Sequence, residues 1–444
     1  MSRILELCHR ARLARRPVPP KSMCTCVLLV FLLTAALPRT AVPQEELSAG
    51  GTPEPDKAIA EPGPTEVRIV GHVYKPKVVP ATDERIASLQ TPPGFVIEKW
   101  ADGLGNPRMI AIGDDGTVHV TRRKEKDLLM LRDTDGDGRA DEQKVIAKKE
   151  PMLHGIAIRG DKMYLTSIQE VFETEIQSDG SVGELKPIVE GLPDGGQHPN
   201  RTIAFGPDGM LYISSGSASN AADEPNPEHA TMLRADPNDG WKRTIFARGL
   251  RNTIGFDWHP ETQELWGADH GIDWLGDNEQ KEELNRIQEG KHYGWPFVYA
   301  DGQYNPVDEP PGDVSYAEFA AKTEKPALLY TAHAAPMMMT FYTADQFPEE
   351  YRNDAFLAMR GSWNRKPPSG HEIVRIRFDK ASGRPTAIEP FVTGFLVERS
   401  NGEWERFGRP VGVAVMKDGS LLVGDDTNGV LYRIRYTGGE QAGG

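Results

Sequence analysis

A strand–turn–strand unit recurs along this sequence and restricts its fold more than any other feature. In each copy two short alternating apolar runs flank an Asp/Gly turn, as in Ile203-Ala-Phe-Gly-Pro-Asp-Gly-Met-Leu-Tyr212, a pattern typical of a β-hairpin. The first three copies begin at Ile110, Ile156 and Ile203, so they stand 46 and 47 residues apart. That spacing is about the length of one four-stranded propeller blade.

Three further copies complete the series, at Gly255–Trp266, Phe341–Leu357 (distorted) and Val413–Val423. Six copies predict an all-β fold, a six-bladed β-propeller of four-stranded antiparallel blades, over residues 67–436. Because such a ring must close, we expect the strand Phe95–Lys99 to complete the blade that ends in Val430–Arg435. The long gap between the fourth and fifth copies predicts an excursion around 301–325, and the one short helix expected is Asp277–Gln288.

Residues 1–41 have the pattern of a secretory signal peptide. Basic residues precede the apolar run Cys26–Leu37, which is about as long as a signal-peptide core and too short to span a bilayer comfortably. We therefore expect a periplasmic or secreted protein; the alternative is an uncleaved N-terminal anchor. Residues 42–66 are rich in Pro, Gly, Ala and Glu, which predicts a disordered linker, and residues 437–444 are expected to form a flexible tail.

Charge and cysteine content exclude several classes of function. The formal net charge is −14, and removal of the basic leader would make the remainder more acidic still. This argues against nucleic acid or an anionic membrane surface as a partner. All three cysteines, Cys8, Cys24 and Cys26, lie in the leader. A processed chain would have no disulfide, thiolate metal site, cysteine nucleophile or covalently attached haem, so redox chemistry would need another cofactor.

Four segments next to the predicted hairpins carry reactive side chains. They contain His154-Gly155, His198–Arg201, Gly249–Gly255 and Ala268–Ile272. Propellers bind ligands at the mouth of the central channel, on loops that enter from each blade, so we expect these segments to face one pocket. Any one of them alone is more simply explained as structural, but their recurrence at equivalent blade positions favours a shared site.

The order of several motifs resembles one enzyme family. In sequence they are Gly195-Gly-Gln-His-Pro-Asn-Arg201, Gly249-Leu-Arg-Asn-Thr-Ile-Gly-Phe-Asp257, Glu264-Leu-Trp-Gly-Ala-Asp-His-Gly271, Glu282-Glu-Leu-Asn285 and His292-Tyr-Gly-Trp-Pro296. Over about residues 90–436 the chain resembles the soluble glucose/sorbosone dehydrogenases that use pyrroloquinoline quinone (PQQ). The resemblance implies a PQQ- and Ca²⁺-dependent enzyme that oxidises a sugar or aldehyde-type substrate by hydride transfer. Electrons would pass to an external acceptor, since no haem motif exists in the chain.

Positions that match the family motifs imply roles for single residues. His198, as a neutral imidazole, would be the general base that takes the substrate's hydroxyl proton. Arg251 would supply positive charge beside the reduced cofactor. The backbone carbonyls of Gly271 and Ile272 would hold a Ca²⁺ that polarises the accepting carbonyl of the cofactor. The other cofactor-binding residues implied are His154, Asn252, His333, Arg360 and Arg409.

Two further Ca²⁺ sites are predicted. Glu283 and Tyr293 resemble a structural Ca²⁺ site of the same family. Independently of the family, an Asp/Gly-rich stretch matches the start of an EF-hand loop, with its carboxylates at Asp133, Asp135 and Asp137. Lys144 stands where a regular EF-hand has its bidentate Glu, so the alternative is a solvated turn between two strands.

Some positions depart from the family pattern and bear on substrate choice and on PQQ binding. Gln197 stands where some members carry an acidic residue, His154 occupies a glutamine position, and His333 lies near a cofactor-contacting threonine. These departures resemble the sorbosone branch more than the glucose-specific one.

Two other functions stay open at this stage. A Ca²⁺-dependent lactonase of the same architecture would need carboxylates that converge in the channel, for which Asp269, Glu283 and Asp425 are candidates. A non-enzymatic propeller would bind a glycan or a protein. The tryptophans that would line a sugar-binding face, or else fill the blade cores, are Trp295, Trp363 and Trp404.

Overall fold

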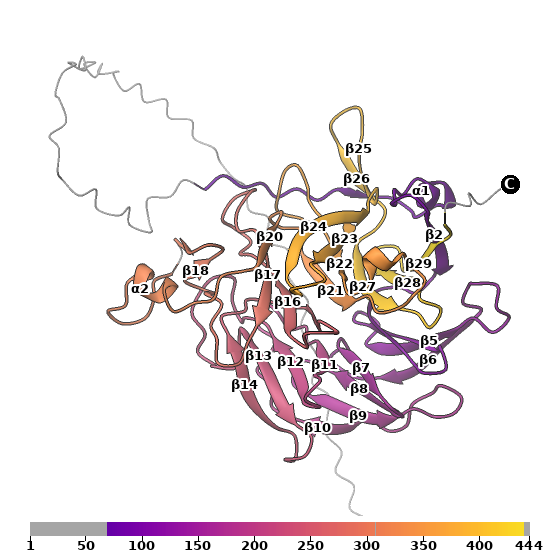
Figure 1. The fold of residues 1–444 in the computed structure, drawn as a ribbon, viewed down its shortest axis with the longest axis horizontal. Helices are drawn as coiled ribbons and strands as arrows, with labels where there is room; N and C mark the ends of the chain where they lie inside the picture. The colour runs from indigo at the N-terminus through magenta and orange to yellow at the C-terminus, as the bar shows by residue number, and fades with distance from the viewer. Residues whose placement is uncertain (1–68, 307, 439–444) are drawn as a thin grey trace, which may run out of the picture. The chain divides into compact units, whose positions relative to one another are not determined.

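The computed structural model describes residues 69–306 and 308–438, and regular structure there is almost entirely β. The predicted leader, the whole predicted linker and residues 439–444 of the tail lie outside the described residues. Six four-stranded antiparallel sheets contain most of the strands (Figure 1). Each begins with one of the hairpins expected from the repeats, which confirms those six hairpins.

The first three sheets each consist of four consecutive strands. The first contains β3 (Pro107–Ile112), β4 (Val118–Arg122), β5 (Asp127–Arg132) and β6 (Glu142–Lys148). The second contains β7 (Ile156–Arg159), β8 (Lys162–Thr166), β9 (Val171–Glu175) and β10 (Lys186–Val189). The third contains β11 (Ile203–Phe205), β12 (Leu211–Ser215), β13 (Thr231–Asp236) and β14 (Lys242–Arg248).

The last three sheets include one strand from the beginning of the described chain. The fourth contains β15 (Gly255–Trp258), β16 (Leu265–Asp269), β17 (Glu282–Ile287) and β20 (Leu328–Tyr330). The fifth contains β21 (Pro336–Phe341), β22 (Ala355–Met359), β23 (Glu372–Phe378) and β24 (Pro385–Val392). The sixth contains β27 (Pro410–Val415), β28 (Leu421–Asp425), β29 (Val430–Tyr436) and, beside β29, β2 (Phe95–Ala101). The antiparallel pairing of β2 with β29 confirms that Phe95–Lys99 joins the sheet that ends in Val430–Arg435.

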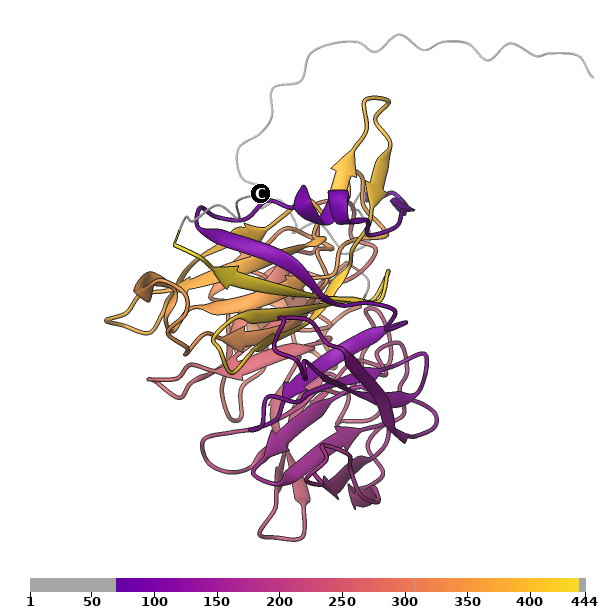
Figure 2. The same ribbon diagram turned by 90° about the vertical axis from the view of Figure 1, so that its right-hand side faces the viewer.

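The remaining elements are short. A three-stranded sheet joins β1 (Lys77–Val78), β26 (Trp404–Arg406) and β25 (Leu396–Glu398), and β25 and β26 project beyond the other sheets in Figure 2. The predicted excursion holds the pair β18 (Val298–Tyr299) and β19 (Gln303–Tyr304) and the helix α2 (Tyr316–Ala320). The other helices are α1 (Asp83–Ala87) and one 3-10 turn, Glu349–Tyr351. None of the helices in the described ranges has the length and apolarity to cross a membrane.

The helix predicted over Asp277–Gln288 is wrong, because the second half of this segment forms β17 and none of it is helical. Glu282–Ile287 pairs with β16 on one side and with β20 on the other. Charged residues such as Glu282 and Glu283 favour a helix by local propensity, but pairing on both edges satisfies the backbone and overrides that preference.

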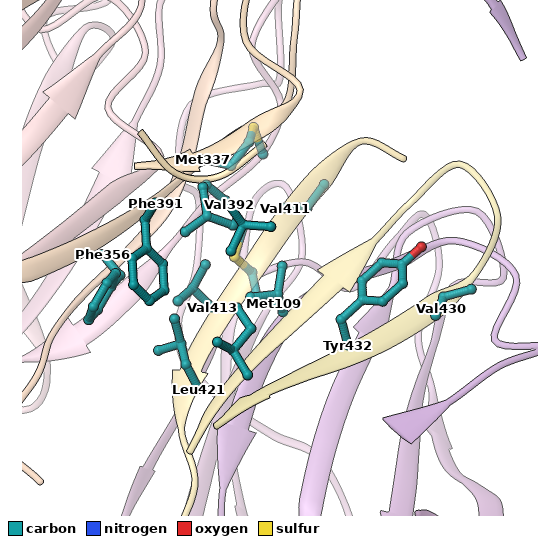
Figure 3. Packing of buried hydrophobic residues seen from close by; sticks show 14 of the residues in the cluster. Met109, Met337, Phe356, Phe391, Val392, Val411, Val413, Leu421, Val430 and Tyr432 are labelled. Carbon is teal, nitrogen blue, oxygen red and sulfur yellow. The ribbon is translucent and has the colours of Figure 1, made fainter. Parts of the chain in front are cut away.

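The largest apolar cluster packs where the first strands of the sheets adjoin. Met109 of β3, Met337 of β21 and Val413 of β27 belong to it, together with Phe356 and Phe391 of the fifth sheet (Figure 3). β3 contacts β7 and β27, β7 also contacts β11, and β21 contacts β15 and β27. Burial of these side chains is the main source of stability, and it fixes each sheet against its neighbours.

Candidate active site

One cavity of about 350 Å³ brings together connections between strands. The predicted site residues that line it are His198, Arg251, Asn252, Gly271, His333, Arg360 and Arg409. Each connection contributes only one or two of them, so the site depends on the packing of several sheets.

The antiparallel strand order explains why these residues meet. Strand direction reverses at every step, so the connection between the second and third strands of a sheet lies at the same end as the connection to the next sheet. The cavity-lining residues lie on, or directly beside, connections of these two kinds. The turns between first and second strands, such as Pro207–Gly209, lie at the opposite end.

His198 is held as a neutral base. Its Nδ1 lies 2.8 Å from Ser217 Oγ and 3.1 Å from the Ser217 carbonyl oxygen. The Ser217 hydroxyl donates its own proton to the Ser219 carbonyl at 2.6 Å, so Nδ1 of His198 must donate and Nε2 carries the lone pair. Burial, together with the nearby charge of Arg251, lowers the pKa of His198 well below its usual 6.5. Near neutral pH the ring can therefore accept a proton at Nε2.

The loop that carries His198 is fixed by the buried side chain of Arg201. This guanidinium donates to the carbonyl oxygens of Pro193 at 3.0 Å, Asp194 at 3.1 Å and His198 at 3.1 Å. A Cβ atom at Gly216 would lie 2.6 Å from Cβ of His198, so glycine is needed there to make room. The motif His198–Arg201 thus contains both the candidate base and its support.

Arg251 is buried and held by neighbouring connections. Its Nη2 donates to Asn220 Oδ1 at 2.6 Å and to Asp273 Oδ2 at 3.1 Å. Its backbone N–H and that of Asn252 donate to the two carboxylate oxygens of Asp269 at 2.8 and 2.7 Å. Asp269 therefore fixes the backbone of the Arg251–Asn252 pair, and both side chains reach the cavity.

Five titratable residues that line the cavity were not predicted, namely Arg108, Arg123, His270, Asp273 and Glu282. His270 stood inside a motif singled out from the sequence, and its Nε2 donates to the Pro336 carbonyl oxygen. Burial lowers the pKa of His270 to about 3. The neutral ring therefore has an unprotonated Nδ1.

Glu282, and not its neighbour Glu283, lines the cavity. Successive side chains of a strand point to opposite faces, and the family motif does not show which of the two glutamates faces inward. The Glu282 carboxylate accepts the backbone N–H groups of Gly271 at 2.9 Å and Ala335 at 2.8 Å. Burial raises the pKa of Glu282 to about 8.

Four guanidinium groups that line the cavity lie near the buried carboxylate of Asp426. Asp426 accepts hydrogen bonds from Arg108 at 2.6 Å and from Arg360 at 2.8 Å. The Arg409 guanidinium donates to backbone carbonyls. Arg123 makes no hydrogen bond or ion pair with the described residues. Positive charge therefore exceeds negative charge in this part of the lining.

The arginine cluster fits a ligand that carries several carboxylates. Arg108 Nε is buried without an acceptor among the described residues. Because these like charges share a poorly solvated place, burial and the nearby charge of Arg360 lower the pKa of Arg409 well below its usual range. An anion bound there would relieve this cost and accept the free N–H groups.

Two histidines implied as cofactor contacts have other roles in the structure. His154 does not line the cavity: it is fully buried, with its Nε2 3.5 Å from Arg108 Nη2. His333 lines the cavity, but its Nε2 donates to the Gly276 carbonyl oxygen at 2.7 Å and its Nδ1 lies 3.2 Å from Asn364 Nδ2. The other ring nitrogen of His154, Nδ1, lies 3.0 Å from the Arg201 carbonyl oxygen. The ring nitrogens of both histidines are therefore engaged within the protein, and contact of either with a cofactor stays a prediction.

Three predicted metal ligands also lie outside the cavity lining. Ile272 is buried. Glu283 Oε1 accepts the backbone N–H of Ala300 at 2.7 Å, and the Tyr293 hydroxyl accepts that of Gln288 at 2.8 Å. Each of these two side chains is engaged by a different stretch of backbone, and metal binding by them stays a prediction.

The aspartates of the EF-hand-like stretch lie together, far along their sheet from the cavity. Oxygen atoms of Asp133, Asp135 and Asp137 lie within 4.8 Å of one another. Asp133 accepts the backbone N–H groups of Gly136 at 2.8 Å and Gly138 at 2.9 Å. The β5–β6 connection joins a third and a fourth strand, which places it at the end opposite the cavity. Calcium binding there stays a prediction.

The tryptophans considered for sugar binding differ in position. Trp363 lines the cavity, Trp295 is buried, and Trp404 is half-buried in β26. Gln197, at the departure beside His198, also lines the cavity and donates to Asp273 Oδ2 at 3.1 Å.

The chain is similar to a known protein family and to proteins of bacteria. Residues 89–437 match the TrAA12-like family. An uncharacterised protein of Borreliella burgdorferi is 30% identical over 375 residues, which cover 80% of this chain and 93% of that protein. An aldose sugar dehydrogenase of Escherichia coli is 27% identical over 184 residues, 38% of this chain and 47% of that enzyme.

A solved structure shares the fold. The holo form of the pyranose dehydrogenase PQQ domain from Coprinopsis cinerea superposes with a TM-score of 0.67 at 20% identity, covering 78% of this chain and 97% of that domain. Together with the family match, this confirms the resemblance to the soluble PQQ-dependent dehydrogenases.

Proposed function

Because the chain belongs to the TrAA12-like family, we propose that it is a PQQ- and Ca²⁺-dependent dehydrogenase of a sugar or aldehyde-type substrate. Its six sheets would be the blades of a six-bladed propeller. The observation that carries the proposal is a neutral His198 and a buried Arg251 in the same cavity as an excess of guanidinium groups. The predicted leader would direct the enzyme to the periplasm or out of the cell.

The residues present fit the two cofactors. Arg123, Arg360 and Arg409 would bind the carboxylates of PQQ, and the Gly271 carbonyl with the nearby Glu282 carboxylate offers the oxygen ligands that Ca²⁺ prefers. PQQ, when bound with Ca²⁺, supplies a hydride acceptor that the side chains of this chain lack. Electrons would then pass to an external acceptor.

His198 would act on the substrate hydroxyl. Loss of a hydride from carbon leaves an acidic hydroxyl proton, and Nε2 of the neutral imidazole can take it. Ser217 holds the ring through Nδ1, so the proton-accepting nitrogen keeps its direction. The imidazolium formed is disfavoured beside Arg251, so the proton would pass on readily to solvent.

Arg251 would stabilise negative charge that develops during the reaction. Its guanidinium is fixed by Asn220 and Asp273 before any substrate binds. A charge held in place in a poorly solvated site needs little reorganisation during the reaction, so its effect is larger than in water. Asn252 lies next to it at the cavity and would donate a hydrogen bond to the cofactor.

The lactonase alternative has less support. Asp269, Glu283 and Asp425 do not line the cavity. Asp425, for example, accepts the backbone N–H groups of Arg409 at 2.7 Å and Thr427 at 2.8 Å. These carboxylates hold connections in place and do not converge on a shared ligand.

Reconstitution tests the proposal directly. Protein without the leader is prepared free of cofactor, and dye reduction is followed with aldoses, sorbosone and simple aldehydes. We expect reduction that requires both PQQ and Ca²⁺. Lactone hydrolysis without PQQ would favour the lactonase, and the absence of PQQ binding would leave a glycan- or protein-binding module.

The pH dependence of the rate should reflect the lowered pKa of His198. The neutral ring is the active form, and a lower pKa means that protonation occurs only at more acidic pH. We therefore expect kcat/KM to stay level as the pH falls through 6.5, the usual value, and to decline only below it. In Arg251→Gln the neighbouring charge is lost, so the acid limb should move toward higher pH. An unchanged limb in that variant would contradict the assignment of His198 as the titrating base.

A further inference from the structure

Two tryptophans meet at the rim of the cavity. Trp363 lines the cavity, and Trp274 lies edge-on to it with ring centroids 5.3 Å apart and an interplanar angle of 87°. The Trp274 residue is 49% exposed. Large exposed aromatic surface beside a ligand cavity is typical of a binding surface, because leaving it in water carries a free-energy cost.

The loops that carry the pair are tied together. Asn364 Nδ2 donates to the Asp273 carbonyl oxygen at 2.6 Å, next to Trp274 in the chain. His333 links the same two connections, since Nε2 donates to the Gly276 carbonyl oxygen and Nδ1 lies beside the Asn364 amide. The Trp363 carbonyl accepts the backbone N–H of Tyr74 at 3.0 Å. Trp274 is thus presented on a braced loop, and little conformational entropy is lost when a ligand packs on it.

The polar groups nearby are those that recognise sugar hydroxyls. Gln197, Asn200 and Asp273 line the cavity beside Trp363. Asn200 Oδ1 has no hydrogen-bond partner among the described residues. Hydroxyl groups pair with planar amide and carboxylate groups, while the C–H face of a pyranose packs on an aromatic ring. The rim offers both kinds of contact.

The size of the cavity sets the position of a longer ligand. Its volume of about 350 Å³ is near the lower end of the range of about 300–1,000 Å³ for ligand pockets. A cofactor and one sugar ring would fill it. Any further ring of the same molecule would therefore lie outside, at the rim where the two tryptophans meet.

We propose that Trp274 and Trp363 form an aromatic subsite for the second ring of a di- or oligosaccharide whose terminal ring enters the cavity. This rests on the proposed function, since the ring in the cavity is the one that is oxidised. Trp274 contributes only to binding of the outer ring and takes no part in the reaction.

The test compares Trp274→Ala with wild type on matched sugars: glucose with cellobiose and maltose, galactose with lactose, and xylose with xylobiose. We expect kcat/KM for at least one disaccharide to fall about tenfold, the size of one lost aromatic contact, while the monosaccharides stay within about twofold. Trp274→Phe should keep most of the disaccharide activity. Tyr304→Ala is the matched control, because Tyr304 is also an exposed aromatic residue, at 38%, but does not line the cavity.

If Trp274→Ala lowered kcat/KM equally for monosaccharides and disaccharides, or for neither, the proposal would be overturned. A direct binding measurement separates it from the proposed function: calorimetric titration of the same sugars into cofactor-free wild type and Trp274→Ala. Disaccharide binding that depends on Trp274 without any PQQ-dependent oxidation would retain the subsite and reject the dehydrogenase. PQQ-dependent oxidation of monosaccharides with no higher kcat/KM for the disaccharides would retain the dehydrogenase and reject the subsite.

Discussion

In His198→Ala, turnover should fall by about 10²–10⁴-fold, the usual contribution of a general base, while PQQ affinity changes little. The imidazole is neutral and is held through Nδ1 by Ser217, so its removal takes away the proton acceptor and no charge. The rate is measured with saturating PQQ and Ca²⁺, and the affinity by titration of the cofactor-free protein.

Two controls make this result specific. His72→Ala removes a half-exposed histidine that pairs with Asp277 and should leave both quantities unchanged. In Ser217→Ala the ring loses one of its two acceptors on Nδ1, so a smaller loss of rate is expected. If PQQ affinity fell in His198→Ala as much as the rate did, His198 would be a cofactor contact and the assignment as base would fail.

Arg123→Gln should weaken PQQ binding by about 10–100-fold and leave the stability of the cofactor-free protein unchanged or slightly higher. A charge-assisted hydrogen bond to a carboxylate contributes about 1.5–3 kcal/mol. Without a ligand, Arg123 makes no hydrogen bond or ion pair with the described residues, and burial and the charge of Arg360 lower its pKa. Its removal therefore costs nothing until an anion is bound.

The informative result is a loss of PQQ affinity without any loss of stability in the cofactor-free protein. PQQ affinity is followed by titration and stability by thermal unfolding with and without PQQ. Arg139→Gln is the matched control, since Arg139 is exposed and lies in the β5–β6 connection away from the cavity. A variant at Arg123 that bound PQQ as tightly as wild type would show that the arginine cluster is not the cofactor's carboxylate site.

The hairpins and their spacing were readable from the sequence because they depend on local chemistry. Alternation of apolar residues has a period of two, and Asp-Gly turns need only their own backbone conformations. The pairing of β2 with β29 was also predictable, since a ring that closes needs a partner for its last strand. By contrast, Glu282–Ile287 was expected in a helix, because its position between β16 and β20 depends on residues far away in the chain.

The residues of the candidate site also fall into two groups, those found by local motifs and those found only from the packing. Motifs were enough to find the connections that carry reactive groups and to identify His198, Arg251 and Asn252. Tertiary packing was needed to show that Glu282 lines the cavity and Glu283 does not, and that Arg123 and Arg360 line the same cavity. The physical reason is that a motif is a local property, whereas the direction of a strand side chain and the convergence of like charges depend on how sheets distant in sequence pack together.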